Sequence, residues 1–566
     1  MRLLKAELEK AIECRRRGQW REAGRIYQSI LRAEPANFEA AHGLGVVYLQ
    51  SGQAERSERQ FGVAVLLDPD AAAAHHDRGL ALRALKRPAD AVASYDRAIA
   101  LEPGHAVAYR NRGTALHDLS LFDEAIASYD KAVALKPDDA AAHYQRGNLL
   151  LRLARAKDAL ASFDAAIAVD PLHAASFNNR ANALRELNRP EEALADYDRA
   201  IALKPDGAPA FCNRGFALQD LGRLDEAMTS YNRAIALKPD FYEALKNRGT
   251  LKLLLGQMRQ GFSDFEYRLR GEDLSANPRL RAIRPWSGGD PAGQSIVVHG
   301  DGAFGDLVQF SRYLPLLAAQ DARVTLLAPT AHCGILSMLL PGIDVVSRVE
   351  EFADIGFRCE ILSLPHYFRT ELSTVPPCAN SSRRGTRRAD KSSGRFDDGR
   401  FSIGICWQGN PARNIDRGRS IPLIEFRAVA QVPGVRLVGL QKHHGLDQLQ
   451  GLPPDMRVDT LGQDFDSGPD AFIDTAAAMA ELDLVVTCDT AVAHLAATLG
   501  RPTWIALRAV PEWRWLLERN DSPWYPTVRL FRQKEPDRWA PVFVDIAAAL
   551  RETVAAKNAG RRDGDD

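Results

Sequence analysis

The chain has 566 residues, in which 73 Lys plus Arg are balanced by 73 Asp plus Glu. This length exceeds what one hydrophobic core supports, so two or more domains are expected, and the balanced charge argues against a nucleic-acid partner. The cysteines form no CxxC pair, the charged N-terminus lacks a signal peptide's apolar core, and no apolar run approaches the ~20 residues of a membrane span. We therefore expect no zinc site, no transmembrane segment and a cytoplasmic location.

The N-terminal half repeats every 34 residues. Proline marks the period at Pro35, Pro69, Pro103, Pro137, Pro171, Pro205 and Pro239. The units run 38–71, 72–105, 106–139, 140–173, 174–207 and 208–241, with a diverged unit before them from about residue 4 and another after them to about 275. A period of this length is typical of helix–turn–helix arrays. We expect an α-solenoid over residues 1–275.

Small and aromatic residues recur at fixed places in each unit. The first helix carries Gly45, Gly79, Gly113, Gly147, Ala181, Gly215 and Gly249. The second carries Ala91, Ala125, Ala159, Ala193 and Ala227, and Phe61, Tyr95, Tyr129, Phe163, Tyr197 and Tyr231. Small residues allow two helices to approach, and we expect the aromatic ring to fill the space between neighbouring units. This pattern resembles the tetratricopeptide repeat and predicts a protein partner.

One position of the first helices carries carboxamides that face the predicted groove. These are Asn111, Gln145, Asn179, Asn213 and Asn247. A carboxamide offers both a donor and an acceptor, so this row is able to hold an extended peptide by its backbone. The row is similar to the asparagine ladder of the O-GlcNAc transferase superhelix. The alternative is that these side chains tolerate the packing and solvate the groove.

After residue 275 the pattern changes to short apolar strands that alternate with helices. We expect strands at 295–299, 323–328, 343–346, 401–407, 435–440, 484–487 and 503–507. Near-continuous apolar strands separated by helices are typical of parallel sheets covered on both faces. The apolar-poor residues 376–400 form a predicted linker between two α/β lobes, 284–375 and 401–557.

Two strand–helix turns carry the candidate chemistry. The first is Gly300–Asp306, where Asp306 opens a helix expected over 307–319 and serves either as a helix cap or as a general base. The second runs from Asp489 to His494 and begins a helix expected over 491–499. Free N–H groups at such a helix start suit a phosphate. A packed core histidine is the alternative for His494.

The two turns together resemble the heptosyltransferase-like, family 9-type glycosyltransferases of the GT-B fold. The likeness covers roughly residues 284–535 and also uses CWQGNP (406–411), LQK (440–442) and Arg419-Ser420-Ile421-Pro422. It implies that Asp306 deprotonates the acceptor hydroxyl. It implies a donor site made of Arg419, Asp489, Thr490, Ala491, His494, Asn410, Gln441 and Lys442. Ala491 stands where the family has Gly.

The resemblance implies a metal-independent, inverting transfer from a nucleotide sugar to a hydroxyl of a protein or glycan, with no cofactor. Asp464-Phe465-Asp466 matches the metal box of another transferase fold, but it follows no apolar strand and is interpreted as a loop. The alternative function is an inactive scaffold that only binds partners. The altered linker and Ala491 favour this alternative, and the intact Asp306, Asp489 and His494 oppose it. The donor base and sugar, the acceptor class and the oligomeric state stay open.

Overall fold

The computed structural model describes residues 2–270, 277–300, 303–351, 355–378, 396, 398–411, 416 and 418–562. The chain divides into two compact units, Met1–Ala217 and Leu218–Asp566. This division falls before the boundary expected at residue 275, so the last repeats belong to the second unit. Within that unit, Phe262 packs edge-on against Trp513, with ring centroids 5.6 Å apart. Most of the predicted linker 376–400 lies outside the described residues.

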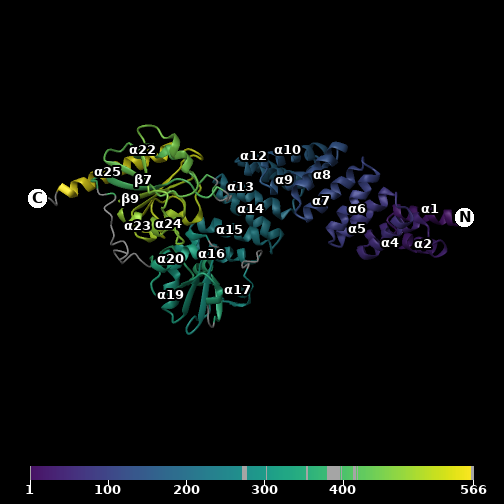
Figure 1. Ribbon diagram of the computed structural model, residues 1–566, viewed down its shortest axis with the longest axis horizontal. Helices are drawn as coiled ribbons and strands as arrows, with labels where there is room; N and C mark the ends of the chain where they lie inside the picture. The colour runs from purple at the N-terminus through teal and green to yellow at the C-terminus, as the bar shows by residue number, and fades with distance from the viewer. Residues whose placement is uncertain are drawn as a thin grey trace. The chain divides into compact units, whose positions relative to one another are not determined.

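Paired helices build the repeats, as Figure 1 shows for α1 to α16. The first helices are α1 (Arg2–Arg16), α3 (Phe38–Gln50), α5 (Ala72–Ala84), α7 (Ala106–Asp118), α9 (Ala140–Arg152), α11 (Ala174–Glu186), α13 (Ala208–Asp220) and α15 (Tyr242–Leu254). The second helices are α2 (Trp20–Ala33), α4 (Ala54–Leu67), α6 (Pro88–Leu101), α8 (Phe122–Leu135), α10 (Ala156–Val169), α12 (Pro190–Leu203), α14 (Leu224–Leu237) and α16 (Met258–Phe265). The predicted α-solenoid is confirmed.

The repeated glycine makes room for the aromatic ring of its own repeat. A Cβ atom at Gly113 would lie 2.8 Å from Cε1 of Tyr129, and Gly79 faces Tyr95 in the same way. Both rings are buried, with 0% of Tyr95 and 2% of Tyr129 exposed. The ring thus packs between the two helices of its own repeat and also reaches the next repeat, because Tyr95 belongs to the same core cluster as Ala115 of α7.

Gly113→Ala is expected to destabilise the array by about 1–3 kcal/mol, because the added methyl group overlaps the Tyr129 ring. The midpoint of urea unfolding, followed by far-ultraviolet circular dichroism, measures the effect. Gly104→Ala is the matched control, because a Cβ atom there meets no atom within 4 Å. Equal midpoints for the two variants would show that the glycine is not needed for the close approach.

Two parallel sheets follow the repeats. The first contains β1 (Arg284–Pro285), β2 (Ser295–His299), β3 (Arg323–Leu327), β4 (Asp344–Val346) and β5 (Phe357–Glu360), in the order β1-β5-β2-β3-β4. The second contains β6 (Phe401–Cys406), β7 (Val435–Gly439), β8 (Val458–Thr460), β9 (Leu484–Cys488), β10 (Thr503–Leu507) and β11 (Val528–Arg532), in the order β11-β10-β9-β6-β7-β8. The predicted strands are all present, and β1, β5, β8 and β11 were not predicted.

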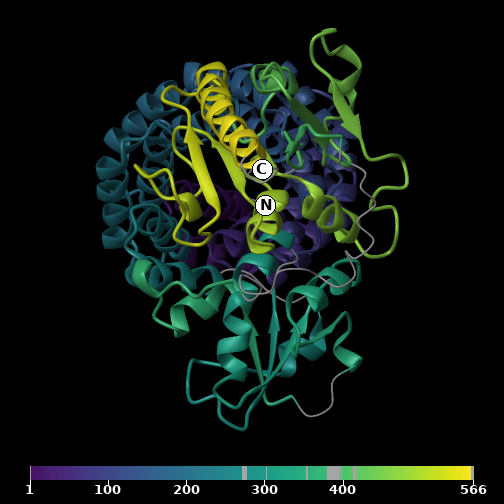
Figure 2. The same cartoon turned by 90° about the vertical axis from the view of Figure 1, so that its left-hand side faces the viewer.

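Helices flank both sheets. They are α17 (Pro278–Ala282), α18 (Phe304–Phe310), α19 (Leu314–Ala318), α20 (Thr330–Leu339), α21 (Leu364–Tyr367), α22 (Arg427–Ala430), α23 (Ile473–Glu481), α24 (Ala491–Thr498) and α25 (Ala540–Arg562). The helix expected over 307–319 is divided into α18 and α19 by a 3-10 turn at Ser311–Tyr313. Figure 2 shows α25, in yellow, along one face of the second sheet, where Phe543 packs with Ile403 and Val486. Among the described residues, no helix has the length and apolar composition of a membrane span.

Candidate functional site

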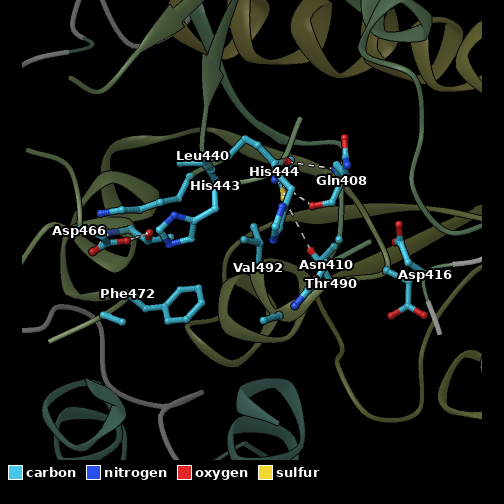
Figure 3. A pocket seen from close by; sticks show the side chains of 18 of the residues that line it. Gln408, Asn410, Asp416, Leu440, His443, His444, Asp466, Phe472, Thr490 and Val492 are labelled. Atoms are coloured by element: carbon cyan, nitrogen blue, oxygen red, sulfur yellow. Dashed lines mark hydrogen bonds between the residues drawn. The ribbon is translucent and has the colours of Figure 1, made fainter. Parts of the chain in front are cut away.

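A cavity of about 330 Å³ lies at the carboxyl ends of β6, β7 and β9 (Figure 3). The chain leaves β6 for β7 on one side, while β9 pairs with β6 on the other. Ligands of open α/β sheets bind at this kind of reversal in strand order. The lining residues are Cys406, Gln408, Gly409, Asn410, Asp416, Arg419, Leu440, Gln441, Lys442, His443, His444, Asp466, Ala471, Phe472, Thr475, Asp489, Thr490, Ala491 and Val492. Seven of the eight predicted donor-site residues are among them, and His494 is not.

Arg419 carries a partly buried positive charge at the cavity wall. Its Nη2 atom donates to the backbone carbonyl of Asp489 and lies 3.3 Å from the Asp489 carboxylate. Burial opposes the charge of Arg419, but Asp489 and Glu512 outweigh burial and raise the pKa of the guanidinium. Burial raises the pKa of the Asp489 carboxyl, but Arg419 together with other neighbouring groups outweighs burial and holds this pKa below its usual value. Both groups are therefore charged near neutral pH.

The first turn of α24 also faces the cavity. Thr490 precedes the helix with extended backbone, and its side chain caps no N–H group of the helix. Ala491 and Val492 line the cavity, and the first N–H groups of a helix have no intrahelical acceptor. Backbone donors and the positive end of the helix dipole thus lie beside Arg419, an arrangement that suits an anionic ligand.

Gln441 and Lys442 hold neighbouring loops in place. The side-chain carbonyl of Gln441 accepts from the backbone N–H groups of Trp407 at 3.1 Å and Gln408 at 3.0 Å. Its amide donates to the carbonyl of Gln408 at 2.9 Å. Lys442 donates through Nζ to the carbonyl of Phe465. Both residues line the cavity, and Gln441 shapes it by fixing the loop after β6.

The apolar side of the cavity was not predicted from the sequence. Figure 3 shows Phe472 and His443 on the side away from Asp416. Phe472 has left-handed backbone, with φ of 69°, and its ring stacks on Phe304 with centroids 4.1 Å apart. Asp466 lies in a loop, as interpreted from the sequence, and accepts from the backbone N–H of Asp474 in the first turn of α23.

His494 lies in the packed core next to α24. It is 6% exposed, its Nδ1 atom is 3.0 Å from the Tyr525 hydroxyl, and its ring stacks on Trp515 with centroids 5.2 Å apart. Burial lowers the pKa of His494 to about 3, so the ring is neutral at pH 7. These contacts favour the packed core histidine over a contact with a diphosphate.

His494→Ala is expected to destabilise the second unit by about 1.5–3 kcal/mol, because a stacked ring and a buried hydrogen bond are lost. The stability of the variant should also decrease less at acidic pH than that of the original chain. Only the unfolded imidazole binds a proton between about pH 6.5 and 3, so His494 makes the native protein less stable as the pH falls through that range. Thermal unfolding from pH 4 to 8 measures both effects.

His444→Ala is the control for this variant, because His444 is exposed in the cavity. Its free energy of unfolding should stay within about 0.5 kcal/mol of that of the original chain. If His494→Ala binds nucleotide more weakly but is as stable as the original chain, His494 contacts the ligand and is not merely a core residue.

Asp306 lies in the first turn of α18, directly after β2 in the sequence. Its carboxylate pairs with Nη2 of Arg514. Gly305 allows α18 to approach α24, because a Cβ atom there would lie 3.0 Å from Cδ2 of His494. The turn residues 301–302 lie outside the described residues. Arg514 is a further residue of the site that was not predicted from the sequence.

The predicted carboxamide row is largely bonded within the repeats. Asn111 bonds through Nδ2 to Nε2 of His76 at 2.9 Å, one repeat earlier. Asn179 donates to Asn148 at 2.7 Å, and Asn213 donates to Asn178 at 3.1 Å. Gln145 is half-buried, and Asn247 lies on α15 in the second unit. The bonded amides of Asn111, Asn179 and Asn213 join neighbouring repeats, which favours the packing alternative for these three.

Comparison with known proteins identifies the repeats. Tetratricopeptide repeat models match residues 15–77, 76–140 and 208–241, and a TPR repeat model matches residues 181–222. Among solved structures, a tetratricopeptide repeat protein from Parabacteroides merdae is 17% identical, with 42% of this chain and 94% of that chain covered and a TM-score of 0.35. PilW, a type IV pilus biogenesis factor, is 20% identical, with 37% and 97% covered and a TM-score of 0.35.

One curated relative matches across half of the chain. Protein FlbA of Caulobacter vibrioides is 25% identical over 324 residues, which are 52% of this chain and 53% of that protein. The chain thus spans about half the length of this relative. The family matches and the helix pairs together show that residues 15–250 are an array of tetratricopeptide repeats, followed by two parallel α/β sheets.

Proposed function

We propose that the C-terminal half is a metal-independent, inverting glycosyltransferase of the GT-B type that uses a nucleotide-sugar donor. The observation that carries the proposal is the cavity at the ends of β6, β7 and β9. It combines the Arg419 guanidinium, the start of α24 and an apolar wall with Phe472. A nucleoside diphosphate has the same two parts, an anionic group and a flat base.

The arrangement of both sheets supports the same function. Each sheet is parallel and reverses its strand order, at β6/β9 in the second and at β2/β5 in the first. Asp306 follows β2, so a carboxylate lies at the reversal of the first sheet. Two doubly wound sheets, one with a donor cavity and one with a base, meet the needs of transfer between two substrates.

In the proposed reaction, Asp306 accepts the proton of the acceptor hydroxyl while the new glycosidic bond forms. The bond from the anomeric carbon to the diphosphate breaks, and its electron pair leaves with the phosphate oxygen. Arg419 and the N–H groups of Ala491 and Val492 stabilise the charge that develops there. Attack opposite to the leaving diphosphate inverts the anomeric carbon.

The repeats supply a second binding function. Tetratricopeptide repeats imply protein–protein interaction, because stacked repeats present an extended concave surface. We propose that the array binds the acceptor or a partner that delivers it. The amides of Asn111, Asn179 and Asn213 are already hydrogen-bonded within the array, so we expect other side chains to contact the partner.

Titration calorimetry of the full chain with UDP, GDP, ADP and CMP tests the proposal. We expect one of them to bind, and the matching sugar nucleotides to release nucleoside diphosphate or monophosphate when incubated with the protein. A chain that binds none of the four, and releases none from their sugar derivatives, is a partner-binding scaffold and not a transferase.

A further inference from the structure

Arg514 joins three side chains around Asp306. Its Nε atom donates to Oε1 of Gln309 at 2.7 Å. Its Nη1 atom donates to Oε1 of Glu512, and its Nη2 atom donates to Oδ1 of Asp306. The Arg514 guanidinium also stacks on the Trp513 ring at 4.4 Å. Because a guanidinium is planar and its donors have fixed directions, these contacts determine where the Asp306 carboxylate lies.

Glu512 shares the charge of Arg514 with Asp306. Its second carboxylate oxygen accepts from the backbone N–H of Arg514 at 2.9 Å, so the side chain is held at both oxygens. The side chains of Arg514, Asp306 and Glu512 are 12%, 21% and 26% exposed. Two carboxylates therefore compete for one mostly buried cation, and neither is neutralised by it alone.

The surrounding charges place the last dissociable proton of this cluster on Glu512. Burial raises the pKa of Glu512 to about 7, with nearby Asp489 adding to the effect and Arg514 and Arg419 opposing it. Burial works against the charge of Arg514, but Asp306 and the other carboxylates outweigh burial and raise the pKa of the guanidinium. Arg514 is thus a permanent cation, while Glu512 changes its charge near neutral pH.

We propose that Arg514 is a positioning residue that holds Asp306 for proton transfer and is shared with Glu512, so that Asp306 works as a strong base only while Glu512 is ionised. The inference rests on the proposed transferase function. When Glu512 is protonated, the Arg514 charge is no longer shared with it, acts more strongly on Asp306 and weakens the proton affinity of Asp306. When Glu512 is ionised, it takes part of that charge, and Asp306 accepts the hydroxyl proton more readily.

The pH profile of nucleotide release, measured with the sugar nucleotide that the panel identifies, tests the inference in the full chain. The original chain should speed up about tenfold as the pH rises through about 7. Glu512→Gln should remove this rise and keep the low-pH rate from pH 6 to 8. Arg514→Lys should lower kcat by about tenfold or more, because an ammonium lacks the planar fork.

Nucleoside diphosphate affinity should stay within about twofold in both variants, because neither residue lines the cavity. Glu518→Gln is the matched control: it removes an exposed carboxylate of the same segment and should keep the full pH profile. A profile of Glu512→Gln that still rises near pH 7, or an unchanged rate in Arg514→Lys, would overturn the inference and leave the transferase assignment standing. A chain that binds no nucleotide would overturn both.

A stability measurement without substrate tests the inference on Glu512 independently of the proposed transferase function. A carboxyl whose pKa is raised on folding binds its proton more tightly in the native state, so it makes the protein less stable as the pH rises from about 4.5 to 7. Thermal midpoints of Glu512→Gln, compared with those of Glu518→Gln, should therefore fall less over this range. Identical pH dependence in the two variants would show that Glu512 does not hold the proton.

Discussion

Asp306→Asn should lower the transfer rate by about 10²–10⁴, the usual contribution of a positioned base. The amide keeps the shape of the side chain and its place in the first turn of α18, but it accepts no proton. Donor affinity should be unchanged, because Asp306 does not line the donor cavity. The measurement is nucleotide release at saturating donor, together with calorimetric affinity for the free nucleotide.

Asp344→Asn is the control for this loss, because Asp344 is an exposed residue of β4 in the same sheet. It should retain the full rate. Equal rates for the two variants in an active preparation would remove Asp306 from the reaction. A loss of thermal stability in Asp306→Asn alone would instead assign the Arg514 ion pair a role in folding.

Arg419→Ala should weaken nucleoside diphosphate binding by about 10- to 150-fold, which corresponds to the 1.5–3 kcal/mol of a charge-assisted hydrogen bond. Arg419 is the cation next to the start of α24, so it is the side chain expected to contact the diphosphate. Calorimetry with the nucleotide and with its monophosphate measures the effect. The diphosphate should lose more affinity than the monophosphate.

Two further variants test whether the effect of Arg419→Ala comes from the charge and geometry of Arg419. Arg419→Lys keeps the charge beside Asp489 but loses the planar fork, so its affinity should lie between those of the original chain and of Arg419→Ala. Arg427→Ala removes an arginine from an exposed ion pair with Asp455 and should leave binding unchanged. If Arg419→Ala binds the diphosphate as tightly as the original chain, the phosphates lie elsewhere.

The periodic parts of the fold were predictable from the sequence, because each 34-residue unit repeats the same packing demand. The buried strands were predictable for a similar reason: Ile403 and Val486 belong to near-continuous apolar runs. The missed strands lack that signal. Arg358 and Glu360 interrupt β5, and Arg529 and Arg532 interrupt β11, since strands nearer the edge of a sheet tolerate polar side chains.

The site was predictable only where its residues follow strand ends. Asn410, Gln441 and Asp489 come directly or closely after β6, β7 and β9, and strand ends of a parallel sheet meet at one edge. Arg514 and Asp306 are separated by 208 residues, and no local pattern connects them. The position of His494 was undecidable from the sequence for the same reason, because its partners Trp515 and Tyr525 lie on later segments.

The contact between Phe262 and Trp513 has a consequence for engineering chimaeras. Trp513 is the residue next to Arg514, so the last repeat supports the segment that holds Asp306. A recombinant protein that joins a foreign repeat array at residue 275 would replace Phe262 and disturb this segment. Exchange in the turn between α12 and α13 cuts no helix and keeps α13 to α16 together, so it is the junction at which acceptor specificity should be transplantable.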